Sequence, residues 1–326
     1  MPREMMYGEA IATAITEEMQ RDANVIFYGQ NMAMTERDPM LKMFGKDRIR
    51  LTPISETAEL GIAIGAAMSG LRPIVELWMS EFMLVAFNQV VNEAPRFRYM
   101  SGGQVKVPLV FKAGYGFAAG WAGQHSNCTY HLFMGTPGLK VVLPSTPADA
   151  LGLMKAAIRD DNPVVFLQHF LLTLEKGPVP DGEHIVPFSV ADIKRAGTDV
   201  TIVATGWMVQ RSLAAAELLA KEGISAEVID PRTLAPLDVA TIVNSVKKTG
   251  RLVLVDQAPR HASAAITIAG EVAEHGFQYL KAPVRMVTAA DTSVPFSEVL
   301  ENFVLPNEEK IMHVVKSTLT KTAVAG

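Results

Sequence analysis

The chain has 326 residues, of which 49% are hydrophobic and 20% charged, and its formal net charge at pH 7 is −4. This length and composition predict a soluble globular protein with room for two domains of ordinary size. The acidic balance and the scattered Lys and Arg residues argue against nucleic-acid and anionic-membrane partners, and no apolar run reaches the roughly 20 residues that span a bilayer.

The N-terminal segment and the cysteine content indicate the compartment. The segment Met1–Met6 includes an acid and has no apolar core of the kind that a secretion signal requires. Cys128 is the single cysteine, so the sequence excludes an internal disulfide and a cysteine-cluster metal site. We therefore expect a cytoplasmic protein.

The first half of the chain alternates strands and helices in the rhythm of a parallel sheet. Apolar residues at every fourth position predict an amphipathic helix that begins near Tyr7. Apolar runs predict strands over 25–28, 73–77, 107–111, 139–143 and 164–167. Helical patterns predict one helix that begins near Glu56 and others over 82–97 and 146–159.

The turn before Glu56 is the most informative stretch of the chain. Pro53 keeps the residue before it extended and Ser55 is a good N-cap, so a helix is predicted to begin at or next to Glu56. Gly61 and Gly65 share one face of that helix and let another helix approach closely, within the chain or across subunits. Taken alone, Glu56 also fits an ordinary first-turn acid, because the helix dipole favours negative charge there.

A glycine-rich loop, 114–126, follows the strand predicted over 107–111 and ends near His125. A dinucleotide fingerprint is disfavoured, because no clear helix follows the glycines and no acidic residue ends a following strand to bind a ribose. His125 lies beyond the C-terminal end of a strand, where open α/β sheets place ligands, and is therefore a candidate catalytic residue. A structural histidine with satisfied hydrogen bonds is the alternative.

The turn Asp160-Asp161-Asn162-Pro163 closes the helix predicted over 146–159. Carbonyl oxygens at the helix C-terminus, together with Asp and Asn oxygens, form the all-oxygen donor set that hard cations prefer. The same residues also favour a simple capped turn. From the local sequence both interpretations stay open.

The periodicity stops between 170 and 187, where Gly and Pro accumulate, so we place a boundary there between domains over 1–186 and 187–326. Beyond it, predicted strands over 200–204, 226–230, 252–255 and 284–287 alternate with helices over 208–221, 239–248, 264–274 and 308–319. The second domain is therefore also α/β. It contains no obvious catalytic cluster, and we expect it to serve assembly.

Seven stretches of the chain, taken together, are similar to one protein family. They are Ile54-Ser55-Glu56, 61–67, 70–76, 98–103, Gly123-Gln124-His125-Ser126, 137–142 and 157–164. Over nearly its whole length the chain resembles the β subunit of the thiamine-diphosphate-dependent decarboxylating component of 2-oxo acid dehydrogenase complexes. The resemblance implies a two-domain, transketolase-like α/β fold, in which a pyrimidine-binding domain with a parallel sheet precedes a transketolase C-terminal-like domain.

The resemblance also implies partners. Members of the family form α2β2 heterotetramers in which the α subunit holds the diphosphate and the magnesium ion of the cofactor. No Gly-Asp-Gly with a following Asn occurs in this chain, so we expect it to be inactive without an α subunit. A lipoyl acyltransferase that accepts the acyl or hydroxyalkyl unit is the second expected partner.

Individual residues take roles by the same resemblance. Glu56 matches the carboxylate that hydrogen-bonds to the cofactor's aminopyrimidine ring and promotes its imino form, which is acid–base catalysis through a cofactor. Phe82 matches the aromatic residue that packs on the pyrimidine, and Ile54 lines the same pocket. His125 matches the active-site histidine that assists proton movements. The potassium-binding positions of some members match Leu109, Ala157, Ile158, Asp160 and Asn162.

Three places depart from the family pattern. The chain has Gly29-Gln30-Asn31 where many relatives have Gly-Glu-Asp, and Leu167-Gln168-His169 where many have Leu-Glu-His. The turn over 258–263 is closer to the acetoin dehydrogenase branch. The expected substrate is therefore a 2-oxo acid or acetoin. A stand-alone carboligase or transketolase-like heteromer, and a non-catalytic pseudo-subunit, are the alternatives.

Overall fold

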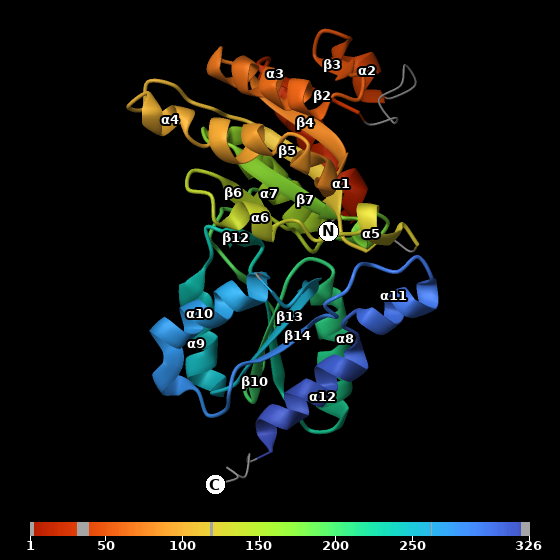
Figure 1. The fold of residues 1–326 in the computed structure, drawn as a ribbon, viewed down its shortest axis with the longest axis vertical. Helices are drawn as coiled ribbons and strands as arrows, with labels where there is room; N and C mark the ends of the chain where they lie inside the picture. Colours follow the sequence, from red (N-terminus) through yellow and green to blue (C-terminus); the bar gives the residue numbers. More distant parts are fainter. Residues whose placement is uncertain (1–2, 31–38, 118–119, 262, 321–326) are drawn as a thin grey trace. The chain divides into compact units, whose positions relative to one another are not determined.

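The structure, a computed structural model, describes residues 3–30, 39–117, 120–261 and 263–320 (Figure 1). The chain forms two compact units, Met1–Gly116 with Leu132–Phe188, and Phe117–His131 with Ser189–Gly326. The segment Phe117–His131 thus packs with the second unit, although the sequence order places it within the first predicted domain. Of the family departures, Asn31 and Ala262 lie outside the described residues.

The first unit is built on a parallel sheet with the strand order β6-β7-β5-β4-β2-β3. The strands are β2 (Val25–Gly29), β3 (Ile49–Leu51), β4 (Arg72–Met79), β5 (Val110–Tyr115), β6 (Lys140–Val142) and β7 (Val164–His169). Their apolar runs are buried almost throughout, as expected when helices cover both faces of a parallel sheet. The strand predicted over 107–111 begins only at Val110, because Pro108 has no N–H to donate to a ladder.

The helices of the first unit include α3 and α7 at the positions predicted. The bounds are α1 (Tyr7–Arg21), α2 (Pro39–Phe44), α3 (Glu56–Met68), α4 (Phe97–Met100), α6 (His131–Met134) and α7 (Pro147–Arg159). The Thr146 hydroxyl caps α7 by accepting the Asp149 N–H at 3.2 Å. Apart from the neighbouring backbone of α3 itself, a Cβ at Gly61 or Gly65 would have no described atom within 4 Å. The predicted close approach of a second helix is therefore not made within the described chain and stays a prediction for a partner subunit.

The continuous helix predicted over 82–97 is wrong. A 3₁₀ turn covers Ser80–Leu84, a π-helical turn covers Gln89–Glu93, and α4 covers Phe97–Met100. Pro95 contributes to the break, because it has no N–H with which to continue an α-helical ladder. Single π turns of this kind interrupt helices and often occur at functional sites.

The second unit is a smaller α/β sandwich with the strand order β14-β13-β10-β11-β9. Its strands are β9 (Asp192–Arg195), β10 (Val200–Ala204), β11 (Ala226–Asp230), β13 (Leu252–Pro259) and β14 (Arg285–Ala289). Its helices are α5 (Ala122–His125), α8 (Met208–Lys221), α9 (Val239–Thr249), α10 (Ala264–Gly276), α11 (Glu298–Val304) and α12 (Glu308–Leu319). Strand β9 pairs antiparallel with β11, whereas β14, β13, β10 and β11 are parallel.

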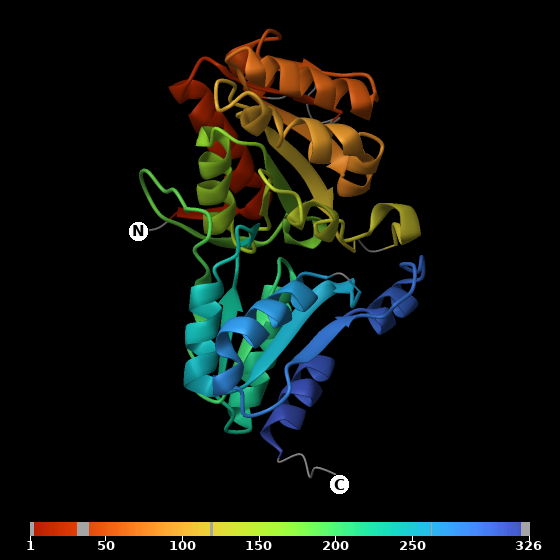
Figure 2. The ribbon, with the colours of Figure 1, turned by 60° about the vertical axis from the view of Figure 1, so that its left-hand side comes forward.

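Side-chain alternation along the strands builds two separate cores in the second unit. Ile202 of β10 and Val253 of β13 pack with α8 and α12 on one face, whereas Val203 and Leu254 pack with α9 and α10 on the other. Figures 1 and 2 show these helix pairs on opposite faces of the sheet.

Two further short strands of the first unit, β1 (Arg3–Met6) and β8 (Lys176–Val179), form an antiparallel pair outside its main sheet.

Along the described stretches of the chain, no helix is both long and apolar enough to cross a bilayer.

Candidate active site

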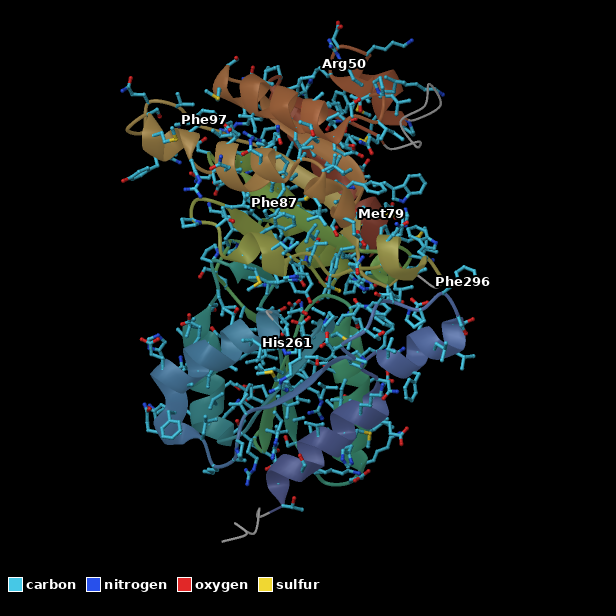
Figure 3. All side chains as sticks on the ribbon, viewed as in Figure 1. Arg50, Met79, Phe87, Phe97, His261 and Phe296 are labelled. Carbon is cyan, nitrogen blue, oxygen red and sulfur yellow. The ribbon has the colours of Figure 1, made fainter. Side chains whose placement is uncertain are left out.

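Two connections at the carboxyl edge of the first unit's sheet carry the residues predicted to bind the pyrimidine ring. The connection from β3 to α3 contains Ile54 and Glu56, and the 3₁₀ turn after β4 contains Phe82. Met79, labelled in Figure 3, ends β4 at this edge. Parallel α/β sheets bind their ligands beyond the carboxyl ends of their strands. The structure therefore brings the three predicted residues to the edge at which a ligand is expected.

The side chains of Ile54, Glu56 and Phe82 are all at least partly exposed to solvent at this edge. Ile54 is 76% exposed, whereas Glu56 and Phe82 are half-buried. The Thr57 hydroxyl donates to the Val85 carbonyl oxygen at 3.2 Å, which ties the first turn of α3 to the segment after Phe82. An apolar surface beside one carboxylate can pack against a heteroaromatic ring and hydrogen-bond to a ring nitrogen.

A second acid in the first turn of α3, Glu59, is buried and only 2% exposed. Its carboxylate accepts from the Thr52 hydroxyl at 2.8 Å, the Ser55 N–H at 3.3 Å and the Gln30 amide at 2.9 Å. Its main-chain oxygen accepts from the Tyr28 hydroxyl at 2.8 Å. Burial, and then the charge of Glu59, raise the pKa of Tyr28. Glu59 thus connects the ends of β2 and β3 to the start of α3.

Strands β2 and β4 meet closely beneath this edge. A Cβ on Gly29 would lie 2.1 Å from the Glu76 carbonyl oxygen, so only glycine fits at the end of β2. The Gln30 N–H donates to that same oxygen at 3.1 Å. The Glu76 carboxylate pairs with Lys112 of β5, both side chains being buried. A buried ion pair thus lies within the sheet under the candidate site.

His125, the second predicted catalytic residue, ends the short helix α5 in the second unit. The loop that carries it is fixed to that unit at several points. Phe117 packs in a small apolar cluster with Ala289 and Val294, and the Gly120 N–H donates to the buried Glu301 carboxylate at 2.8 Å. His125 is therefore placed by contacts within the second unit, whereas Glu56 belongs to the first.

Tyr130 fixes the other end of the His125 loop. Its hydroxyl donates to the fully buried carboxylate of Asp256, which also accepts from the Ala258 N–H at 3.0 Å and the Ala265 N–H at 3.2 Å. Burial raises the pKa of the Asp256 carboxyl, and these hydrogen bonds oppose the rise. The second unit, expected from its sequence to serve assembly, therefore also holds a candidate catalytic loop.

The five candidate potassium positions lie together around the C-terminus of α7. The carbonyl oxygens of Ile158 and Asp160 each accept from Arg72 at 3.1 Å, and the Leu109 oxygen accepts from the Val164 N–H at 2.8 Å. The Ala157 oxygen accepts the Asp160 N–H at 3.4 Å. A carbonyl oxygen has two lone pairs. At Ile158 and Asp160 the donor already present is the positively charged guanidinium of Arg72.

The side chains at the same turn are already paired with cations of the protein. The Asp160 carboxylate pairs with Lys140, and the Asn162 side-chain oxygen accepts from Arg98 at 2.8 Å. Asp161 pairs with Arg72 at 2.8 Å and with Lys106 at 2.7 Å, and its hydrogen bond from Lys106 is the main cause that lowers its pKa. Lys and Arg side chains thus already pair with or donate to the side chains of this turn, and potassium binding here stays a prediction.

Sequence reasoning missed Glu59 and the Glu76–Lys112 pair. For the pair a signal exists, because Glu76 lies inside the apolar run of the strand predicted over 73–77 and Lys112 directly follows the strand predicted over 107–111. For Glu59 no local signal exists, since an acid in a first helical turn is ordinarily solvated. Its buried carboxylate is satisfied in part by Gln30 and Thr52, which directly follow β2 and β3.

Both halves of the chain are similar to known protein families. Residues 3–172 match the family described as transketolase, pyrimidine binding domain, and residues 189–311 match transketolase, C-terminal domain. The chain is 45% identical to the acetoin:2,6-dichlorophenolindophenol oxidoreductase subunit beta of Cupriavidus necator, over 98% of each chain. It is 43% identical to the mitochondrial pyruvate dehydrogenase E1 component subunit beta-1 of Arabidopsis thaliana, over 96% of this chain and 89% of that protein.

One solved structure has a similar fold. A split-gene transketolase, solved as an inactive beta4 tetramer, superposes with a TM-score of 0.81 and covers 97% of this chain and 98% of its own. The identity is 22%, so this likeness concerns the fold alone.

Proposed function

Because the chain belongs to the family of transketolase-like β subunits of thiamine-diphosphate-dependent 2-oxo acid and acetoin dehydrogenase components, we propose that Glu56 activates the cofactor in a site shared with an α subunit. The observation that carries the proposal is the position of Glu56. It is the first residue of α3, at the carboxyl edge of the sheet, beside the exposed Ile54 and the half-buried Phe82.

The residues at this edge fit one half of the cofactor. Ile54 and Phe82 offer an apolar surface for the aminopyrimidine ring, and Glu56 offers a carboxyl group for a ring nitrogen. Among the described residues no group of three or more His, Cys, Asp or Glu side chains is arranged to hold a metal ion. We assign the diphosphate and its magnesium ion to an α subunit.

The chemistry divides between cofactor and protein. Thiamine diphosphate, when bound, supplies a thiazolium carbon that becomes a nucleophile when it loses its proton. Glu56 would hold the aminopyrimidine ring by sharing a proton with one of its ring nitrogens, and this activation depends on that shared proton. Phe82 and Ile54 orient the ring and exclude water from it. His125 donates or accepts protons near the substrate's carbonyl group.

The proposed reaction cleaves the carbon–carbon bond next to a carbonyl group, in a 2-oxo acid or in acetoin. The resulting unit then passes to the lipoyl group of an acyltransferase. We also propose that potassium binds the main-chain oxygens of Leu109, Ala157, Ile158 and Asp160 at the C-terminus of α7, next to Asn162, and stabilises that turn.

Co-expression with an α subunit tests the function. The complex should reduce an artificial electron acceptor, in a thiamine-diphosphate-dependent manner, with at least one of pyruvate, a branched 2-oxo acid or acetoin. The chain alone should give no reduction. Turnover by the isolated chain, or an assembled complex that is inactive with all three substrates, would contradict the proposal. Co-purification of an acyltransferase from the complex tests the lipoyl step.

A further inference from the structure

Glu59 is the most extensively hydrogen-bonded side chain next to Glu56, although the proposed cofactor contact does not use it. Its carboxylate accepts from two segments: Gln30, which follows β2, and the connection from β3 to α3, through the Thr52 hydroxyl and the Ser55 N–H. All of these contacts lie within the first unit. Three donors therefore converge on one carboxylate, and each comes from a segment that ends at the candidate site.

The burial of Glu59 is costly unless these hydrogen bonds are made. A carboxylate removed from water needs charged or hydrogen-bonding partners. Within the described part of the chain, no Lys, Arg or His forms an ion pair with Glu59. The bonds from Thr52, Ser55 and Gln30 therefore stabilise the buried charge, and the buried charge in turn holds those three donors in place.

The turn that Glu59 holds lacks the usual support of a helix start. The Ser55 side chain does not cap α3; its hydroxyl donates to the Ile54 carbonyl oxygen at 2.8 Å instead. Two contacts with Glu59 fix the residue before Glu56: the Ser55 N–H donates to the Glu59 carboxylate at 3.3 Å, and the Ser55 carbonyl oxygen accepts the Glu59 N–H at 2.9 Å. Without an acceptor at this place, the turn between Thr52 and Glu56 would keep the bond from the Thr52 N–H to the Gly29 carbonyl oxygen at 3.0 Å, but it would lose its connection to Gln30 and the anchor of the Ser55 N–H.

We propose that Glu59 is a positioning residue, which fixes the turn over 52–55 so that Ile54 and Glu56 face the aminopyrimidine ring. This inference rests on the proposed function. Gln30 belongs to the same hydrogen-bond network, because its side-chain amide donates to the Glu59 carboxylate oxygen that does not accept from Thr52 and Ser55. A small displacement of a group that acts in a reaction lowers its rate steeply, about 100-fold for a misplacement near 1 Å.

The test uses the reconstituted heterotetramer and two measurements. The first is deuterium uptake by the main-chain amides of residues 52–58 in the absence of cofactor. The second is the rate at which bound thiamine diphosphate exchanges its thiazolium proton. Glu59→Leu should raise the uptake and slow proton exchange by about 100-fold. Glu59→Gln should keep both near native, because its oxygen still accepts from Thr52 and Ser55 and the Gln30 amide can turn to face it.

A second substitution guards against loss of folding. Thr52→Val removes one donor without a change of shape, and it should raise the uptake and slow the exchange in the same sense as Glu59→Leu but less. Glu227→Gln is the matched control, since Glu227 is a buried, hydrogen-bonded carboxylate in the second unit. It should leave both measurements native even where it lowers the melting temperature.

The outcomes separate this inference from the proposed function. Native uptake and native proton exchange in assembled Thr52→Val or Glu59→Leu heterotetramers would overturn the positioning role, as would raised uptake with native proton exchange. Glu56→Gln serves as the reference. If Glu56→Gln itself exchanges at the native rate, the proposed function fails; if it abolishes exchange while the Glu59 and Thr52 variants behave as native, this inference alone fails.

Discussion

Tyr130→Phe removes the hydroxyl that anchors the His125 loop to the buried carboxylate of Asp256. A hydrogen bond to a charged group contributes roughly 1.5–3 kcal/mol to the free energy of unfolding. Asp256 keeps the N–H groups of Ala258 and Ala265 as donors, so the loss stays near the value of one bond, about 2 kcal/mol. For a unit of this size that corresponds to a melting temperature about 4–8 °C lower.

The sign of the pH dependence follows from the pKa of Asp256. Burial raises this pKa in the folded state, and the Tyr130 hydrogen bond lowers it. Removing the bond raises the folded-state pKa further while the unfolded-state value is unchanged. A carboxyl group with a raised folded-state pKa favours the folded state when protonated, and that contribution is lost as the pH rises through the folded-state pKa. The Tyr130→Phe defect should therefore be larger at neutral than at acidic pH.

Scanning calorimetry of the heterotetramer at neutral and at acidic pH measures how far Tyr130→Phe lowers the melting temperature. Tyr279→Phe is the control. Tyr279 lies in the same unit, and its hydroxyl makes no hydrogen bond to a described residue. Tyr130→Phe should also lower turnover, because the same loop presents His125. An unchanged melting temperature at neutral pH, or a defect that is larger in acid, would refute the reasoning.

Three further predictions concern the site and its surroundings. His125→Ala should lower kcat by about 10²–10⁴-fold, as expected for a proton-transfer group, with little change in the Kd for thiamine diphosphate. If the Kd instead rises by the same factor as kcat falls, His125 is a cofactor-binding residue. Gln30→Glu places a second carboxylate against Glu59, so the melting temperature should fall, and the exchange Gln30→Glu with Glu59→Gln should restore it; no recovery in the double variant would disprove the pairing. Replacement of sodium chloride by potassium chloride should raise the melting temperature through the turn at Asp160, and equal values in the two salts would count against potassium.

Local sequence signals predicted the helices whose first residue is set by residues close to it in the sequence. The helix start at Glu56 follows Pro53 and Ser55, and α7 begins after Thr146 with proline in its first position. The last helix has the predicted bounds of Glu308–Leu319. Thr146 and Asn307 cap their helices with side-chain oxygens, whereas Ser55 occupies the N-cap position without a side-chain cap, so for α3 only the position of the start was predicted correctly.

Long-range contacts decided what the sequence did not show. The His125 loop belongs to the second unit because Tyr130 meets Asp256, which is 126 positions away along the chain. Glu59 has the sequence signature of a solvated first-turn acid, and only the donors from β2 and β3 make it a buried one. Both features are tertiary, and no local propensity encodes them.

The most direct test of the account is thiazolium proton exchange in the Glu56→Gln heterotetramer. If Glu56 shares a proton with the aminopyrimidine ring, the variant should assemble normally, bind thiamine diphosphate and lose the fast exchange of the thiazolium proton. A Glu56→Gln heterotetramer that exchanges this proton at the native rate would contradict the central claim.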